Sequence, residues 1–120
     1  MIILDTNFLI YMMKYKLAHQ LDDRKKELAI PEQVITELET ISTGREKMPD
    51  REAAKLALVL IEKWNIKLLK KDGSADDAIL NLAVENGAKV GTLDRLLIKK
   101  LRAKKIKVMI IRQKKIIVED

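Results

Sequence analysis

The chain of 120 residues is long enough for one domain, and 48% of its residues are apolar, which is enough to fill a hydrophobic core. It contains no cysteine, which excludes disulfides, thiolate metal sites and cysteine nucleophiles, and its one histidine, His19, excludes sites built from several histidines. No apolar stretch approaches the ~20 residues that a membrane-spanning helix needs. We therefore expect one cytoplasmic domain over residues 1–120, with chemistry that depends on carboxylates, hydroxyls or lysines.

The net charge of +6 is concentrated in the second half of the chain. Residues 1–60 contain nine basic and ten acidic residues, whereas residues 61–120 contain fifteen basic and eight acidic ones. Between Arg95 and Lys115 there are ten basic residues and no acidic residue. A cationic surface of this kind favours a polyanionic partner, and nucleic acid is the commonest. The alternative is a solvated, lysine-rich surface of the type that thermophilic proteins have.

Hydrophobic patterning along the chain predicts alternating strands and helices. Short continuous apolar runs are typical of buried parallel strands, and apolar residues three and four apart are typical of the helices that cover them. The strands are expected over residues 1–4, 27–30, 66–69, 89–92 and 107–111, with residues 116–118 as a further edge strand. The helices are expected over residues 7–16, 32–42, 51–64, 75–85 and 94–103, with a loop over residues 43–50.

This order of elements predicts an α/β fold of three layers. Helices should cover both faces of a central, mostly parallel, five-stranded sheet. In such sheets the functional crevice lies beyond the carboxyl ends of the strands, where the strand order reverses. Residues that directly follow strands are therefore the first candidates for a functional site.

Acidic residues occur at several of these positions. Asp5 ends the first expected strand, Asp94 follows the fourth, and Asp76 and Asp77 begin the helix before the fourth strand. Glu37 lies on the inward side of its helix, where a carboxylate is least expected. Each of these residues alone has a structural explanation, as a helix cap or a solvated side chain.

Together, the carboxylates indicate a metal site. Two carboxylates within ~4 Å of each other repel by about 4 kcal/mol at an effective dielectric constant near 20. A protein tolerates this repulsion when a divalent cation neutralises the cluster or when a proton is shared. A set of oxygen ligands without histidine or cysteine favours Mg²⁺ or Mn²⁺ over zinc.

Four segments of the chain resemble the motifs of PIN domains, which are small metal-dependent ribonucleases. The segments are, in chain order, residues 3–7 (ILDTN), 31–38 (PEQVITEL), 76–83 (DDAILNLA) and 90–97 (VGTLDRLL). The resemblance spans residues 1 to about 111, and the order of the four motifs makes it more specific than any one of them. It implies a single PIN-like domain with the three-layer fold.

The resemblance also implies roles for individual residues. The metal-binding and catalytic set would be Asp5, Glu37, Asp77 and Asp94. Asp77 is preferred to Asp76 because the family's acid directly precedes a small residue and an aliphatic one. The supporting residues would be Thr92, Asn7 and Asp76. The basic residues that hold the RNA backbone would be Arg95, Lys99, Lys100, Arg102, Lys104 and Lys105.

The function that the resemblance implies is endonucleolytic hydrolysis of RNA phosphodiester bonds with Mg²⁺ or Mn²⁺. The role would be rRNA processing or that of the toxin in a toxin–antitoxin pair. The residues of the third and fourth motifs resemble those of archaeal proteins related to small-subunit rRNA-processing factors. The partners would be RNA and, according to the role, a second copy of the chain, an antitoxin or a ribosome-assembly protein, with no membrane partner.

Two alternatives belong to other functional classes. One is a non-catalytic PIN scaffold that binds RNA or protein. The other is a receiver-like signalling domain with Asp72 as the phosphoacceptor and Thr92 as the switch residue. The receiver-like domain would need a second acid beside Asp5, and the chain has Thr6 at that position.

Overall fold

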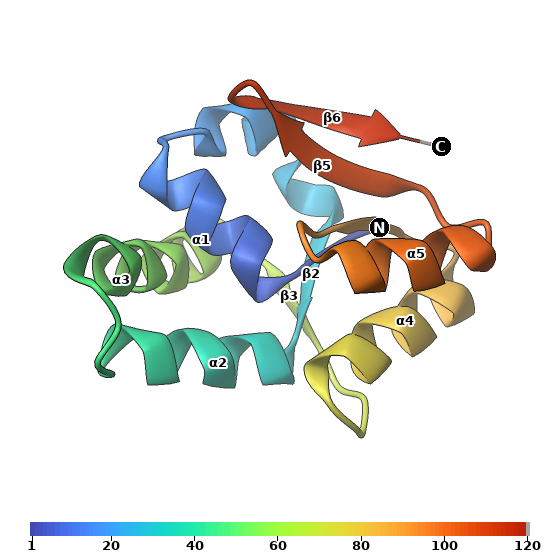
Figure 1. Ribbon diagram of the computed structural model, residues 1–120, viewed down its shortest axis with the longest axis horizontal. Coiled ribbons are helices and arrows are strands. Elements are labelled where there is room, and N and C mark those ends of the chain that lie inside the picture. Colours follow the sequence, from blue (N-terminus) through green and yellow to red (C-terminus); the bar gives the residue numbers. More distant parts are fainter. Residues whose placement is uncertain (120) are drawn as a thin grey trace.

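A six-stranded sheet forms the centre of the computed structural model, which describes residues 1–119 (Figure 1). The strands lie in the order β3-β2-β1-β4-β5-β6. All neighbouring strands are parallel except β5 and β6, which form an antiparallel hairpin. The strands are β1 (Ile2–Leu4), β2 (Leu28–Pro31), β3 (Lys67–Leu69), β4 (Lys89–Gly91), β5 (Val108–Arg112) and β6 (Lys115–Glu119). The α/β fold with a mostly parallel sheet is confirmed, and the further edge strand makes six strands instead of five.

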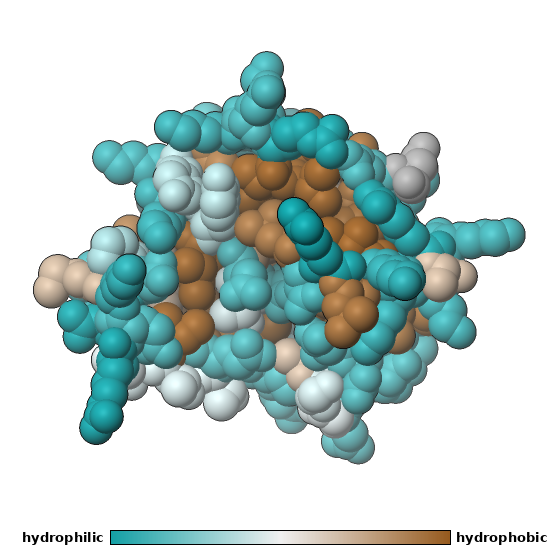
Figure 2. Space-filling view, viewed as in Figure 1, coloured by the Kyte–Doolittle hydropathy of each residue, from teal (hydrophilic) through white to brown (hydrophobic). Residues whose placement is uncertain are grey.

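Helices pack on both sides of this sheet. Figure 1 shows α1, α2 and α3 together on one side and α4 and α5 on the other. The helices are α1 (Thr6–Lys14), the 3₁₀ segment η1 (Ala18–Glu27), α2 (Glu32–Ser42), α3 (Met48–Lys63), α4 (Ala75–Asn86) and α5 (Arg95–Ala103). None of these helices is long and apolar enough to cross a membrane. In the face drawn in Figure 2, hydrophilic side chains form the periphery and hydrophobic ones lie nearer the middle.

Two parts of the chain differ from the sequence prediction. Helix α3 begins at Met48, inside the predicted loop over residues 43–50, because Pro49 suits the first turn, where no backbone N–H group is needed. The polar segment η1 was not predicted, since Leu21 is its only buried residue and gives no helical periodicity. The other boundaries agree with the prediction within two residues.

The strand order reverses beside β1. This strand pairs with β2 on one side and with β4 on the other. Strands β2 and β3 are added on one side of β1, and strands β4, β5 and β6 on the other side. Leu4 is in register with Gly91, and the Asp5 backbone N–H donates to the Gly91 carbonyl oxygen at 2.9 Å. The residues that follow these two, Asp5 and Thr92, therefore leave the sheet side by side at its carboxyl edge.

The hydrophobic core fixes the position of this edge. Ile3, Leu4 and Phe8 are fully buried, and burying side chains of this kind stabilises a fold by about 1.5–3 kcal/mol each. Gly91 allows β4 to pack closely against them. A Cβ atom at this position would lie 2.7 Å from Leu4 Cδ2, and the Phe8 ring is also near. Close packing here holds the ends of β1 and β4 together.

Candidate active site

A chain of hydrogen bonds joins three polar residues at the ends of β1 and β4. Asp5 is buried and caps α1, with its Oδ1 atom accepting from the Thr6 backbone N–H at 2.7 Å. Its Oδ2 atom accepts from the Thr92 hydroxyl at 2.8 Å. The same hydroxyl oxygen accepts from the Asp94 backbone N–H at 3.1 Å. Both Asp5 oxygens and the Thr92 hydroxyl are thereby held in fixed positions.

Asp94 is the N-cap of α5. Its Oδ1 atom accepts from the backbone N–H groups of Leu96 and Leu97, at 2.9 and 3.1 Å. This is the ordinary structural role of an aspartate at the start of a helix. Within residues 1–119 its Oδ2 atom has no hydrogen-bond partner and is therefore available to a ligand. The capping role and a ligand-binding role are thus compatible, one for each oxygen.

Electrostatic coupling brings Glu37 and Asp76 into the same group. Burial raises the pKa of Asp5; hydrogen bonds from Thr92 and Thr6 lower it, and the charges of Asp76 and Asp94 raise it. Partial burial raises the pKa of Glu37, as do the charges of Asp5 and Asp76, against a lowering effect of the Thr6 hydroxyl. Such mutual perturbation is a mark of functional sites.

The pKa of Asp76 is raised in the same way. Burial is the largest cause, and the charge of Asp94 adds to it, while the charge of Lys100 acts in the opposite direction. Asp76 lies at the start of α4 and Glu37 lies in α2, and these two helices are in contact. We call Asp5, Glu37, Asp76 and Asp94 the acid cluster.

Asp77 lies outside the acid cluster. Its side chain is exposed, and its backbone N–H donates to the Ser74 hydroxyl at 3.2 Å, as expected for the third residue of a capped helix. Among the acidic groups with a raised pKa, only Asp76 is influenced by the charge of Asp77. The structure therefore brings Asp76, which the family resemblance made a supporting residue, to the cluster.

Two further residues beside Asp5 differ in their surroundings. Asn7 is exposed, and its side chain forms no hydrogen bond within the described residues. Thr6 is 2% exposed, and its hydroxyl lies near Glu37 but has no hydrogen-bond partner in the described part of the chain. A buried hydroxyl without a partner is unusual, and this one lies close enough to Glu37 to lower the pKa of that carboxyl. Two signals in the sequence concern Thr6: its place next to Asp5 and its suitability as a helix N-cap.

The six basic residues assigned to RNA binding lie on separate surfaces. Lys100 is close enough to Asp76 to lower its pKa and therefore faces the acid cluster. Three others, Arg95, Lys99 and Arg102, line a pocket beside the β5–β6 hairpin. Lys104 and Lys105 line a groove at the amino ends of β4 and β5, the opposite edge of the sheet.

The chemistry of the acid cluster fits a divalent cation. Within residues 1–119, no three acidic or histidine side chains form a ready-made group of metal ligands. The available donors are nevertheless all oxygens, which Mg²⁺ and Mn²⁺ prefer. Burial is the largest cause of the raised pKa values of Asp5, Glu37 and Asp76, and the charges of neighbouring acids add to it; a cation would offset both effects. The free Thr6 hydroxyl and Asp94 Oδ2 supply further oxygen atoms.

The fold and its polar edge define a PIN-like domain. The family model described as "PIN like domain" matches residues 2–114, and the chain belongs to this family. It is 39% identical over 122 residues to Ribonuclease VapC4 of Methanocaldococcus jannaschii, covering 95% of this chain and 92% of that protein. The chain is thus a homologue of a ribonuclease.

A solved structure has the same fold. It is described as a domain of a functionally unknown protein from Methanocaldococcus jannaschii, and it superposes with a TM-score of 0.65. The superposition covers 99% of this chain and 96% of that chain, at 21% identity. At this identity the likeness concerns the fold alone. Family membership excludes the receiver-like alternative.

Proposed function

We propose that the protein is a ribonuclease that hydrolyses RNA phosphodiester bonds with Mg²⁺ or Mn²⁺ held by the acid cluster. The observation that carries the proposal is the coupling of four carboxylates at the point where the strand order reverses. The homologous Ribonuclease VapC4 supports it. The name of this relative favours a VapC-type role over rRNA processing, with a second copy of the chain or an antitoxin as further partners.

Asp5 and Asp94 are the proposed inner ligands. Asp5 is fixed by hydrogen bonds at both oxygens, and Asp94 by its capping bonds, so neither carboxylate has to be ordered when a ligand binds. Asp76 takes the place of Asp77 in the proposed set, because Asp77 is exposed and outside the cluster. Glu37 and Asp76 would hold a second cation or its water molecules.

The chain's own residues prepare the site for hydrolysis. Thr92 keeps the Asp5 carboxylate oriented, and the Thr6 hydroxyl is placed to donate to Glu37 or to a water molecule. When bound, a divalent cation lowers the pKa of a coordinated water and neutralises the charge that develops on the phosphate oxygens. Lys100, which faces Asp76, would offset part of the negative charge when RNA approaches.

Cleavage of a labelled single-stranded RNA in millimolar Mn²⁺ tests this function. Asp94→Asn should lower the rate by about a hundredfold or more, because a metal ligand is lost. Asparagine caps helices as well as aspartate does, so α5 should remain intact. Asp72→Asn is the matched control, since Asp72 is exposed after β3, and it should cleave RNA like the wild type. RNA binding without cleavage by the wild type would favour the non-catalytic scaffold.

A further inference from the structure

A pocket of about 390 Å³ lies between α5 and the β5–β6 hairpin, and most of its polar lining is cationic. Helix α5 contributes Arg95, Lys99 and Arg102, which are four and three residues apart and therefore lie on one face of the helix. The hairpin contributes Arg112 and Glu119. Among the described residues that line the pocket, four positive charges and one negative charge leave a net charge of +3. We call it the hairpin pocket.

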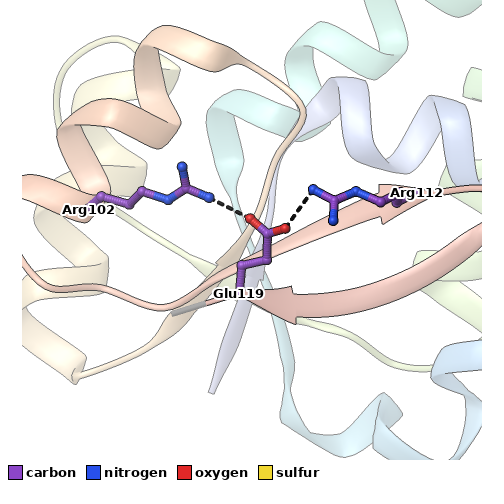
Figure 3. A network of polar contacts seen from close by, with 3 residues as sticks. All are labelled: Arg102, Arg112 and Glu119. Atoms are coloured by element: carbon purple, nitrogen blue, oxygen red, sulfur yellow. Dashed lines mark hydrogen bonds and ion pairs between the residues drawn. The ribbon is translucent and has the colours of Figure 1, made fainter.

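Glu119 holds two arginines of the hairpin pocket in place (Figure 3). Its Oε2 atom accepts from Nη2 of Arg102 at 2.6 Å, and its Oε1 atom accepts from Nη2 of Arg112 at 2.8 Å. The two guanidinium groups come from different elements and approach the carboxylate from opposite sides (Figure 3). Each arginine uses one of its five N–H donors in this way, so the others remain available to a ligand.

The remaining two basic residues of the pocket have no partner among residues 1–119. Arg95 and Lys99 form no hydrogen bond or ion pair with any residue in the described part of the chain. Arginine recognises phosphate through two parallel N–H···O bonds, and lysine adds a point charge. A phosphate group therefore matches the donors of the hairpin pocket better than a single carboxylate does.

The hairpin pocket and the acid cluster share helix α5. Asp94 caps this helix, and Arg95, which lines the pocket, occupies its first position. Arg102 lies seven residues further, which is about 10 Å along the helix axis at 1.5 Å per residue. The proposed substrate carries a phosphate at every nucleotide, which favours an RNA backbone as the source of the phosphate.

We infer that the hairpin pocket binds a backbone phosphate of the RNA substrate. The inference rests on the proposed function and names the residues that hold the substrate. Arg102 and Arg112 make the main contacts, and Arg95 and Lys99 add positive charge. Glu119 pairs with both guanidinium groups in the RNA-free protein and offsets part of their charge.

The test measures binding of a labelled single-stranded RNA in EDTA, where no metal-dependent cleavage occurs, at several salt concentrations. The double variant R102Q/R112Q should bind about tenfold more weakly, because two charge-assisted hydrogen-bonding groups are lost. The slope of log affinity against log salt should fall by ~0.7, the value for one lost phosphate contact. K63Q/K67Q is the matched control: it removes the same charge at the end of α3 and in β3, the other edge strand of the sheet, and should change the affinity less.

Glu119→Gln separates lost phosphate contacts from damage to the hairpin. It breaks the same two ion pairs but keeps all four basic side chains, so RNA should bind as tightly as to the wild type or more tightly. If R102Q/R112Q binds like the wild type, or if Glu119→Gln binds as weakly as the double variant, the inference is wrong. Binding of inorganic phosphate by the wild type but not by the double variant, together with equal RNA affinity of the two proteins, would assign the pocket to free phosphate instead.

The outcome for the hairpin pocket is independent of the outcome for the enzyme. RNA binding that depends on the pocket, together with no cleavage in Mn²⁺, would overturn the ribonuclease and retain the pocket. Cleavage by R102Q/R112Q with an unchanged KM and kcat would retain the ribonuclease and overturn the pocket. The inference itself predicts a raised KM with little change in kcat, because the pocket does not contact the reacting atoms.

Discussion

The Thr92 hydroxyl donates a 2.8 Å hydrogen bond to Oδ2 of Asp5, across 87 positions of the sequence. The bond joins the ends of β1 and β4, the two strands beside the reversal of strand order. Thr92 is fully buried, and its hydroxyl oxygen also accepts the Asp94 backbone N–H. One side chain therefore sets the positions of both proposed inner ligands.

Thr92→Val should destabilise the fold by about 1–3 kcal/mol, the usual cost of leaving a buried polar group without its partner. Valine has nearly the same shape as threonine, so packing is retained, while Asp5 Oδ2 and the Asp94 N–H group each lose a partner. Denaturant unfolding measures the change. Thr92→Ser keeps the hydroxyl and should lose less stability. Equal stability of Thr92→Val and the wild type would show that the bond contributes nothing.

The raised pKa of Asp5 predicts a pH dependence of stability. The unperturbed pKa is 3.8, and burial raises it in the folded protein, so the folded state binds the proton up to a higher pH than the unfolded chain. Between the pKa of Asp5 in the unfolded chain and its raised pKa in the folded protein, the folded state binds more protons than the unfolded state does. The free energy of unfolding therefore falls as the pH rises through this range. The stabilising contribution is complete below about pH 4 and is lost as the pH rises through the raised pKa.

Asp5→Asn removes this loss of stability. The free energy of unfolding of the variant minus that of the wild type should be larger at pH 7 than at pH 3. Chemical denaturation of both proteins at both pH values measures this difference. The comparison between pH values cancels the effect of the exchange on the hydrogen bonds to Thr6 and Thr92. A stability difference between the variant and the wild type that stays constant from pH 3 to pH 7 would contradict the raised pKa of Asp5.

Mn²⁺ should raise the melting temperature, because a ligand that binds only the folded state stabilises it. Two neighbouring substitutions at the start of α4 make a matched test of the acid cluster. Asp76→Asn should reduce the shift in melting temperature, whereas Asp77→Asn should leave it nearly unchanged, since only Asp76 belongs to the cluster. Thermal unfolding with and without Mn²⁺ measures both. A larger loss with Asp77→Asn would restore the choice that the family motif favours.

The fold and three residues of the acid cluster, Asp5, Glu37 and Asp94, were predicted from the sequence, with Asp76 as a supporting residue. Short apolar runs alternate with helical periodicity, so a parallel sheet is the arrangement that buries them. Asp5 and Asp94 directly follow predicted strands, and the ends of neighbouring parallel strands share one edge of the sheet. Their placement needs only the strand order, which short connections largely determine.

The details that depend on side-chain direction could not be predicted. Successive residues on a helix point about 100° apart, so the choice between Asp76 and Asp77 depends on how α4 packs. The same rotation divides the basic residues of α5 between two surfaces that the charge count could not separate. The pair of Arg102 and Glu119 depends on β6 returning beside β5, a contact between residues 17 positions apart.

Gln20 anchors the β5–β6 hairpin to η1, and its substitution should loosen the hairpin locally. Its Nε2 atom donates to the Lys114 carbonyl oxygen at 2.8 Å, and its Oε1 atom accepts the Ile116 backbone N–H at 2.8 Å. Between these contacts the turn places Gln113 and Lys114 at φ values of 51° and 61°, a conformation that is costly for residues other than glycine. An external anchor therefore offsets strain within the turn.

Gln20→Ala should increase the hydrogen-exchange rate of the Ile116 amide by about tenfold, since one hydrogen bond to the turn and one to β6 are lost and the hairpin opens locally. Amides in β1 and β4 should keep their protection, because their bonds lie inside the core. His19→Ala is the matched control, as His19 is exposed in the same 3₁₀ segment, and it should leave the exchange of Ile116 unchanged. Unchanged protection of Ile116 in Gln20→Ala would show that the turn is stable without the anchor, and faster exchange throughout the sheet would show that η1 supports the whole fold.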